Sequence, residues 1–463
     1  MPFAEDFFTF GDDAGIAGGA LEKALTAGYG TDAALFTGGR ALQIEDLEMT
    51  LVNVMAAQRE DCKLMNTLKT LRINSTVHQF DVRKDVGDYE NLFAEELAIP
   101  EASDQDIKRL FVMAKYIQNR RSVSHQATVV RTTADVLAEE KIAGTLNVLK
   151  GAEYACFHGD SAVVPEQYDG LIAQIVSDSK PNITDLRGQT ITGAGFDPFD
   201  SMVALIYERG GEANKMFFPV VLAMQMQELV RDRILFSVAD KKMSTVVDQF
   251  PTPLGTVFFG EDAGADKLFK VKGAVNPSGN IEKRPSAPVS VTLAAAAQSG
   301  SQFLKTTDLG AYTYRVFAVN AAGISEGTAP AAAATVASGN GVTITITPGA
   351  RQGSGFIIAR SLPGSTDVME MVRIPNSGNA TTVYVDLNSD LPGTASLIFI
   401  TERKVQPILQ FGQLLPLQLY PLYPGNRAET PFIVQLYGAL INKAPEWCGL
   451  IKNIGYSGGF AYA

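Results

Sequence analysis

The sequence predicts an α+β protein of several domains, with an all-β segment inserted in its second half. Its 463 residues suffice for roughly three domains, and 46% hydrophobic with 19% charged residues is ordinary for a globular chain. Helical periodicity is clearest at 132–157, whereas helix signals vanish between about 284 and 400. This change of pattern along the chain indicates separate domains.

The chain is acidic, with a formal net charge of −11 and a pI of about 5.0. Phosphate binding needs clustered Lys and Arg, so the overall field does not attract nucleic acid. An acidic wall still suits a container that encloses DNA without holding it, although such a charge also simply aids solubility. The three cysteines lie far apart without CxxC pairing, which predicts buried thiols in a reducing compartment and neither disulfides nor a zinc site: Cys62, Cys156 and Cys448.

Targeting signals are not evident in the sequence. The first residues, MPFAEDFFTFGDDAG, are acidic and contain no basic n-region followed by an apolar h-region, so no signal peptide is expected. No uncharged apolar run reaches ~18 residues, so no transmembrane helix is expected. These features predict a soluble protein made in the cytoplasm, with no membrane partner.

The first 130 residues predict an arm followed by a long two-stranded excursion. Residues 1–65 show helical spacing of apolar residues. The stretch 75–83 alternates as a strand does, and β-forming residues are frequent at 108–130. The acidic stretch 85–106 separates the two. Because an isolated hairpin is only marginally stable, we expect the excursion to rest on a neighbouring subunit.

A long helix is predicted at 132–157, starting with Thr132 and Asp135 as a capping-box-like pair. Its predicted apolar stripe comprises Ala138, Ile142, Leu146, Leu149 and Ala152.

Residues 160–275 alternate helix and strand, which predicts a compact α/β domain. Asp197-Pro198 predicts an N-cap followed by Pro, with Phe199, Val203 and Ile206 on the buried face. A short buried strand at 216–221 and a helix at 221–234 complete this region.

Short strands then follow one another, separated by Gly, Pro, Ser and Asn. Such spacing predicts a β-sandwich, entered through 283–288 and left through 401–404. The last 60 residues again predict strands, at 414–425 and 431–454. The strands of the predicted sandwich are 289–293, 311–320, 341–347, 355–361, 369–374 and 381–386.

Candidates for catalysis are scarce. Of the three histidines, His78 and His125 are predicted on the two excursion strands as surface residues. A Cys156–His158 dyad is geometrically poor, because helical residues two apart do not face each other. No HExxH or GxxxxGK[ST] sequence is present. We therefore predict no catalytic, cofactor-binding or metal-binding residue, no cofactor and no enzyme activity.

Two further segments were considered as binding sites. TGAGFDPF (192–199) precedes a helix and could hold an anion, but a tight loop into a Pro-capped helix is the simpler interpretation. Arg120 and Arg121, with Lys115 and Arg131, form the one basic cluster. It suits pairing with the acidic stretch 85–106 of a neighbour better than it suits nucleic acid.

The order of elements resembles the Hong Kong 97 capsid fold of tailed phages and herpesviruses. FHGD (157–160) through YDGLIAQI (168–175), FPVVLAMQMQELVRDRI (218–234) and TPLGTVFFGEDAG (252–264) are similar to capsid proteins of large contractile-tailed phages. The resemblance implies six regions: an N-terminal arm at 1–73, an E-loop at 74–131, a P domain with its spine helix at 132–167, an A domain at 168–283, an inserted immunoglobulin-like sandwich at 284–400 and return strands to the A and P domains at 401–463.

The insert carries a second resemblance. Its Y-x-Y-x-V-x-A-V-N-x-x-G-x-S phrase, from Tyr312 to Ser325, is similar to a late strand of fibronectin type III domains. The order departs from that family, because GFIIARS (355–361) resembles an earlier strand but follows the phrase. A permuted or merely immunoglobulin-like sandwich is therefore expected. Some capsid relatives form Lys–Asn cross-links, but no such set can be matched here.

The resemblance implies a major capsid protein that forms hexamers and pentamers of an icosahedral phage head around double-stranded DNA. Its main partner would be itself, through the arm and E-loop, with decoration, portal and scaffolding proteins as further partners, and its place would be the virion. Three alternatives remain: an encapsulin-type nanocompartment shell, a phage tail or baseplate protein, and an enzyme with an immunoglobulin-like accessory domain.

Overall fold

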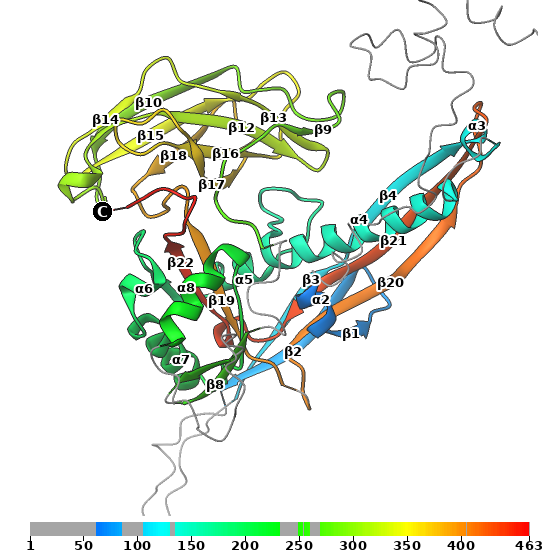
Figure 1. The fold of residues 1–463 in the computed structure, drawn as a ribbon, viewed down its shortest axis with the longest axis horizontal. Helices are drawn as coiled ribbons and strands as arrows, with labels where there is room; N and C mark the ends of the chain where they lie inside the picture. Colours follow the sequence, from blue (N-terminus) through cyan, green and yellow to red (C-terminus); the bar gives the residue numbers. More distant parts are fainter. Residues whose placement is uncertain are drawn as a thin grey trace, which may run out of the picture. The chain divides into compact units, whose positions relative to one another are not determined.

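The computed structural model describes residues 62–85, 105–129, 135–231, 249–252, 254–259, 269–403 and 405–462. All of these except Asp135 belong to one compact unit of the chain. Most of the predicted arm and acidic stretch, together with Thr132 and Arg131, lie outside the described residues. Three β-structures and a separate two-stranded ribbon make up the described fold (Figure 1).

The first structure is a four-stranded sheet covered by the long helix α4 (Val136–His158). The short helix α2 (Lys63–Thr67) directly precedes β1 of this sheet in the chain. β20 and β21 pair antiparallel along most of their length, and β1 adds to β20 in parallel. The strand order is β1 (Lys69–Arg72), β20 (Leu409–Pro421), β21 (Glu429–Asn442) and β4 (Lys115–Ser124).

The predicted stripe of α4 is confirmed at Ala152 and wrong at its first two positions. Ala138 is exposed and Ile142 keeps 49% of its surface, whereas Gly144, Val148 and Cys156 are buried. The buried face follows small residues because the helix lies close to the sheet. A Cβ on Gly144 would come within 3.2 Å of Val434 Cγ2. Close approach, rather than side-chain size, thus selects the face.

The ribbon consists of β2 (Val77–Asp85) and β3 (Asp106–Met113), paired antiparallel. Its predicted pairing is confirmed, but the predicted strand region 108–130 divides at Ala114. There the chain bends, and the Ala114 N–H donates to the Thr76 carbonyl at 2.8 Å. β4 then joins the four-stranded sheet, and α3 (His125–Val129) follows it.

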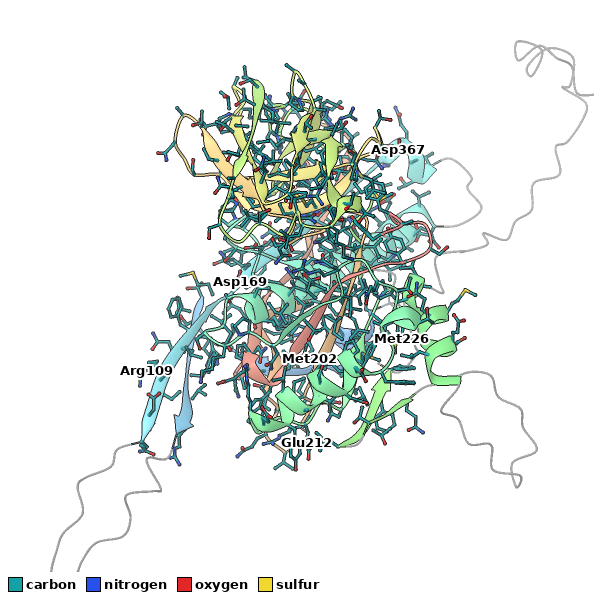
Figure 2. The ribbon with its side chains drawn as sticks, turned by 90° about the vertical axis from the view of Figure 1, so that its left-hand side faces the viewer. Arg109, Asp169, Met202, Glu212, Met226 and Asp367 are labelled. Carbon is teal, nitrogen blue, oxygen red and sulfur yellow. The ribbon has the colours of Figure 1, made fainter. Side chains whose placement is uncertain are left out.

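The second structure is a six-stranded sheet with helices α5 (Leu171–Val176), α6 (Ile191–Ala194), α7 (Asp197–Glu208) and α8 (Val220–Arg231) nearby in the chain. Met202 of α7 and Met226 of α8 belong to its core (Figure 2). The strand order is β5 (Ile183–Asp185), β22 (Gly449–Ile454), β19 (Ala395–Ile400), β6 (Lys215–Phe217), β8 (Gly255–Phe259) and β7 (Gln249–Thr252), and the 3-10 turn η5 (Pro445–Trp447) precedes β22.

The start of one predicted helix and the end of one predicted strand differ from the structure. The structure places Asp197 inside α7 with Phe196 as the N-cap, because the turn at Gly195 (φ +72°) already brings the chain to helical angles at Phe196. The predicted buried face, Phe199, Val203 and Ile206, is confirmed. The predicted strand 216–221 ends at Phe217, since the Pro219 carbonyl accepts the first N–H bond leading into α8.

The third structure is a two-sheet sandwich, and all six predicted strands occur in it. One sheet has five strands and the other three, with a small β11–β14 pair beside them, and a common core lies between them. The five-stranded order is β17 (Met369–Pro375), β16 (Gly355–Arg360), β12 (Tyr314–Asn320), β13 (Gly323–Thr328), β9 (Ser278–Gly279); the three-stranded order is β10 (Ser290–Ala297), β15 (Asn340–Thr347), β18 (Thr382–Asp386); the pair is β11 (Gly310–Tyr312) and β14 (Ala334–Val336), with η4 (Thr306–Asp308) before it.

The predicted range of the insert, 284–400, differs from these pairings at both ends. β9 precedes position 284 yet pairs with β13 of the sandwich. β19 falls before position 400 but pairs with β6 and β22 of the six-stranded sheet. The composition of β19 is that of any buried strand, so only its partners reveal the sheet to which it belongs.

The two glycines of α4 supply a matched test of its close packing. Gly144→Val is expected to lower the free energy of unfolding by about 1–3 kcal/mol, because the added atoms meet Val434 and the Arg121 side chain. Gly151→Ala, where a Cβ meets nothing within 4 Å, should raise it by about 0.5–1 kcal/mol. Urea unfolding of unassembled subunits measures both, and equal effects would contradict the proposed packing.

Candidate functional site

The ribbon is the part of the described fold with the least support from its own subunit. It has two strands, and no third strand pairs with them among the described residues. On one face, Ile107, Phe111 and Met113 keep 49%, 63% and 51% of their surface. Figure 2 shows Arg109 toward the far end of the ribbon, with Asp169 near its other end. Exposed apolar groups in such numbers indicate a contact surface.

Charges on the ribbon contribute little to holding it together. The Arg109 guanidinium donates to the Asp81 carboxylate across the two strands, with Nε and Oδ1 2.9 Å apart. This hydrogen bond lowers the pKa of Asp81 below its ordinary value. Both side chains are more than half exposed, so solvent screens the pair. The base is firmer, because Ile73 and Ala114 are both buried where the ribbon begins and ends.

The four-stranded sheet presents an uncovered face opposite α4. Tyr116, Arg120 and Tyr420 lie on this face and keep 55%, 66% and 55% of their surface (the side chain, for Arg120). The Tyr116 and Tyr437 rings meet edge to face at 4.8 Å. The Gln118 amide donates to the Tyr437 hydroxyl at 2.5 Å. An aromatic and polar surface of this kind is typical of protein–protein contacts.

The predicted basic cluster is only partly present. Arg121 donates to Glu140 of α4 at 2.6 Å, and the Lys115 ammonium donates to the Pro165 carbonyl. Arg120 lies on the uncovered face, with its guanidinium 3.8 Å from Glu429. The sequence could not separate the two neighbouring arginines, since alternation along β4 sends them to opposite faces of the sheet.

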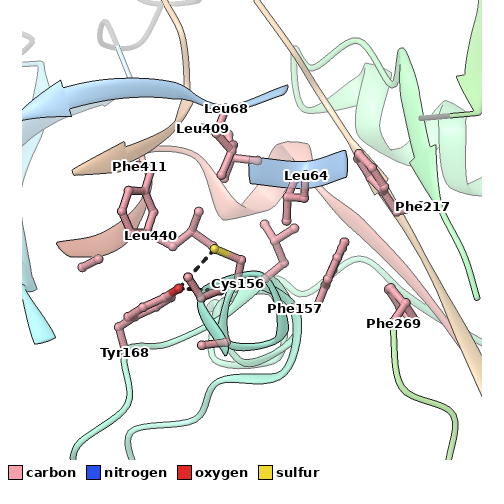
Figure 3. Packing of buried hydrophobic residues seen from close by; sticks show 14 of the residues in the cluster. Leu64, Leu68, Cys156, Phe157, Tyr168, Phe217, Phe269, Leu409, Phe411 and Leu440 are labelled. Carbon is pink, nitrogen blue, oxygen red and sulfur yellow. Dashed lines mark hydrogen bonds between the residues drawn. The ribbon is translucent and has the colours of Figure 1, made fainter. Parts of the chain in front are cut away.

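The core between α4 and the four-stranded sheet contains the buried cysteine Cys156 (Figure 3). Its Sγ lies 3.2 Å from the Tyr168 hydroxyl, which in turn donates to the Ala152 carbonyl. Burial raises the pKa of the Cys156 thiol far above its ordinary value, so the thiolate is disfavoured. Cys62 and Cys448 are buried too, as predicted for all three.

The histidines have separate environments. His158 is the last residue of α4, and its Nε2 accepts the Lys270 backbone N–H at 2.9 Å, so it forms no dyad with Cys156. His78 lies on β2 as predicted, whereas His125 begins α3 instead of lying on a strand. Residues 192–199 form the predicted tight turn between α6 and α7.

A cleft of about 380 Å³ lies where α4, residues 270–272 and β17 meet. Glu370 of the sandwich accepts from the Lys270 ammonium and, at 2.7 Å, from Arg373 Nε. Asp390 similarly lies 3.8 Å from the Lys272 ammonium and 3.3 Å from that of Lys452. These ion pairs connect distant parts of the chain, so the cleft serves as a seat for the sandwich.

Burial and charge act in opposite directions on Glu370. Burial alone would raise its pKa, but the Arg373 and Lys270 cations hold it down at about 2. Burial, with the same two cations, lowers the pKa of His158 to about 3. Both groups therefore resist protonation in the folded protein.

Neither a metal-binding cluster nor a membrane-spanning helix occurs among the described residues. No group of three or more His, Cys, Asp or Glu side chains among them is placed to hold a metal ion. No helix within the same ranges is long and apolar enough to span a bilayer.

The chain is similar to known proteins over most of its length. The model of the SU10 major capsid protein family matches residues 26–263, slightly more than half of the chain. The chain belongs to this family. Members are major capsid proteins, so its role is structural, as a subunit of the capsid shell of a phage virion.

Individual relatives agree with this assignment. The chain is 25% identical to the major capsid proteins of Staphylococcus phages K and S25-3 over 462 residues, covering 94% of this chain and 94% of each relative. Among solved structures, the capsid of the native GTA particle matches with a TM-score of 0.46 and 10% identity, covering 92% of this chain and 100% of that one. The chain of Mycobacterium phage Adephagia matches with a TM-score of 0.42 and 9% identity, covering 92% and 98%.

The seat predicts how stability depends on pH. The unfolded chain binds a proton on His158 below about pH 6.5 and on Glu370 below about 4.5, whereas the folded protein does so only near 3 and 2. Stability should therefore be fully present above pH 6.5, fall as the pH decreases from there, and fall further below 4.5. Urea unfolding between pH 3 and 7, followed by the fluorescence of Trp447, tests this expectation.

Glu370→Gln should lower stability at pH 7 by about 1–3 kcal/mol and flatten the dependence below pH 4.5, because it leaves the partly buried cations Lys270 and Arg373 without their carboxylate. The matched control is Glu326→Gln, which removes a carboxylate that is 66% exposed beside Arg284. Its effect should stay below about 1 kcal/mol. Equal losses in the two variants would contradict the role of the seat.

Proposed function

We propose that the chain builds an icosahedral phage head of hexamers and pentamers around double-stranded DNA, with a Hong Kong 97-type fold. In this proposal residues 1–73 are the arm, 74–131 the E-loop, 132–167 the P domain, 168–283 the A domain, 284–400 the immunoglobulin-like insert and 401–463 the return strands. Two strands cross these bounds, because β9 pairs with the sandwich and β19 with the six-stranded sheet. The observation that carries it is the two-stranded ribbon with apolar side chains exposed on Ile107, Phe111 and Met113.

The ribbon would lie on the uncovered face of the four-stranded sheet of an adjacent copy. That face offers Tyr116, Tyr420 and the cation Arg120, while the ribbon offers apolar side chains next to the acidic stretch 85–106. Tyr and Arg are the residues most often found at the energetic centres of interfaces. Each contact is modest, and many contacts per subunit make the closed shell stable.

We expect a structural role without enzyme activity; in the cleft, Glu370 and Asp390 each pair with cations. Decoration, portal and scaffolding proteins are the proposed further partners. Nucleic-acid content distinguishes this proposal from a nanocompartment shell. Particles purified from an infected host should show the absorbance ratio of a DNA-filled head, and protein cargo without DNA would contradict it.

Phe111→Asp should weaken assembly without unfolding the subunit. Removing a Phe contact of about 1.5–3 kcal/mol predicts a critical concentration for particle formation about 10- to 100-fold higher. Sedimentation velocity and electron microscopy measure assembly, while circular dichroism checks the fold. Val383→Asp on the sandwich, at a side chain that is 57% exposed, is the control and should assemble normally. Normal particles from Phe111→Asp would sink the proposed role of the ribbon.

A further inference from the structure

The end of β20 and the turn that follows it form a second unusual surface, here called the tip and defined as residues 419–427, LYPLYPGNR. Tyr423 keeps 96% of its surface and Tyr420 keeps 55%. Arg427, at the end of the tip, is exposed as well. Each tyrosine precedes a proline, which restricts the backbone and lowers the entropy lost when the turn binds. The tip therefore has the residues and the rigidity of an interface anchor.

A groove of about 500 Å³ lies between the ribbon and the body of the subunit. The ribbon wall is mostly apolar, with Phe80, Leu110 and Val112, and it also includes Lys108. The opposite wall contributes Asp169 and Asp178 in the α5 region, and Lys443 lies further along it. Figure 2 shows the segment with Asp169 beside the ribbon. The volume of the groove is in the range of pockets that hold ligands.

One atom of the groove has an unmet hydrogen-bonding capacity. Asp178 Oδ2 is shielded from solvent and has no hydrogen-bond partner within the described ranges. A shielded carboxylate oxygen without a partner is costly, and an incoming guanidinium would offset that cost.

A subunit cannot place its own tip in its own groove. Leu440 and Asn442 line the groove at the C-terminal end of β21, whereas the tip precedes the N-terminal end of that strand. At about 3.4 Å per residue, a strand of 14 residues holds the two roughly 45 Å apart. The occupant must therefore come from a second copy.

We propose that the tip of one copy enters the groove of another, with Tyr423 against the ribbon wall and Arg427 toward Asp169 and Asp178. The inference rests on the proposed shell function and adds a contact different from the seating of the ribbon on the four-stranded sheet. Two different surfaces meet, so the contact is heterologous and propagates from copy to copy, as closed rings require.

Cross-linking between two singly substituted proteins tests the contact. Tyr423→Cys and Ser177→Cys subunits are mixed, assembled and treated with a short bismaleimide; the buried native cysteines leave little background. Covalent dimers are expected in the mixture at least tenfold above either variant alone. Val383→Cys mixed with Ser177→Cys is the matched control and should give no dimer.

The outcomes separate two failures. Normal particles without the mixed dimer, or with dimers formed by Tyr423→Cys alone, overturn the tip-in-groove contact and leave the shell function standing. Absence of any particle from the unsubstituted chain overturns the proposed assembly itself.

A charge exchange tests the polar half of the contact. Arg427→Glu should raise the critical concentration about tenfold or more, and Asp178→Lys in the same chain should restore it toward that of the unsubstituted protein. Unchanged assembly of Arg427→Glu, or a double variant no better than the single one, contradicts the pairing.

Discussion

The close packing of α4 on the four-stranded sheet is the constraint on which the rest of the fold depends. The core beneath it joins residues from very different parts of the chain, among them Leu64, Cys156, Phe411 and Leu450. Glu153 of α4 is fully buried and accepts the backbone N–H groups of Leu64 and Met65, at 2.8 and 2.9 Å. This core therefore determines where the N-terminal segment joins the body and from where the ribbon departs.

The exposed ribbon extends from a base that is buried in the body of the subunit. Two strands cannot bury both of their faces, and a hairpin is marginally stable alone. Ile73 and Ala114 are nonetheless held in the body, so the ribbon begins and ends at defined positions. In the proposed shell, a fixed base would present the uncovered surface of the ribbon to another copy in one defined position. The tyrosines of the tip, Tyr420 and Tyr423, are likewise exposed in the subunit.

The sandwich is more than an appendage on a linker. In its five-stranded sheet, Val316 and Ile358 point to the sandwich core while Phe317 and Ile357 belong to a second cluster with Val163 and Val164. Both faces of this sheet are thus covered. Inside the sandwich, Arg360 is 1% exposed, donates to Asp386 at 2.6 Å and lies over the Tyr312 ring. The cluster with Val163 and Val164 and the ion pair of Glu370 with Lys270 attach the sandwich at a fixed place.

The sequence by itself determined the kinds of element and their order, because alternation and helical periodicity are local properties. The six sandwich strands, the long helix and the ribbon pairing were all predicted from such patterns. Only the tertiary structure decided which face of α4 is buried, since Gly144 acts through Val434 nearly 300 positions away. It likewise decided that β19 leaves the sandwich and that Arg120 and Arg121 point to opposite faces. Those outcomes depend on partners distant in sequence, and no local pattern of residues contains them.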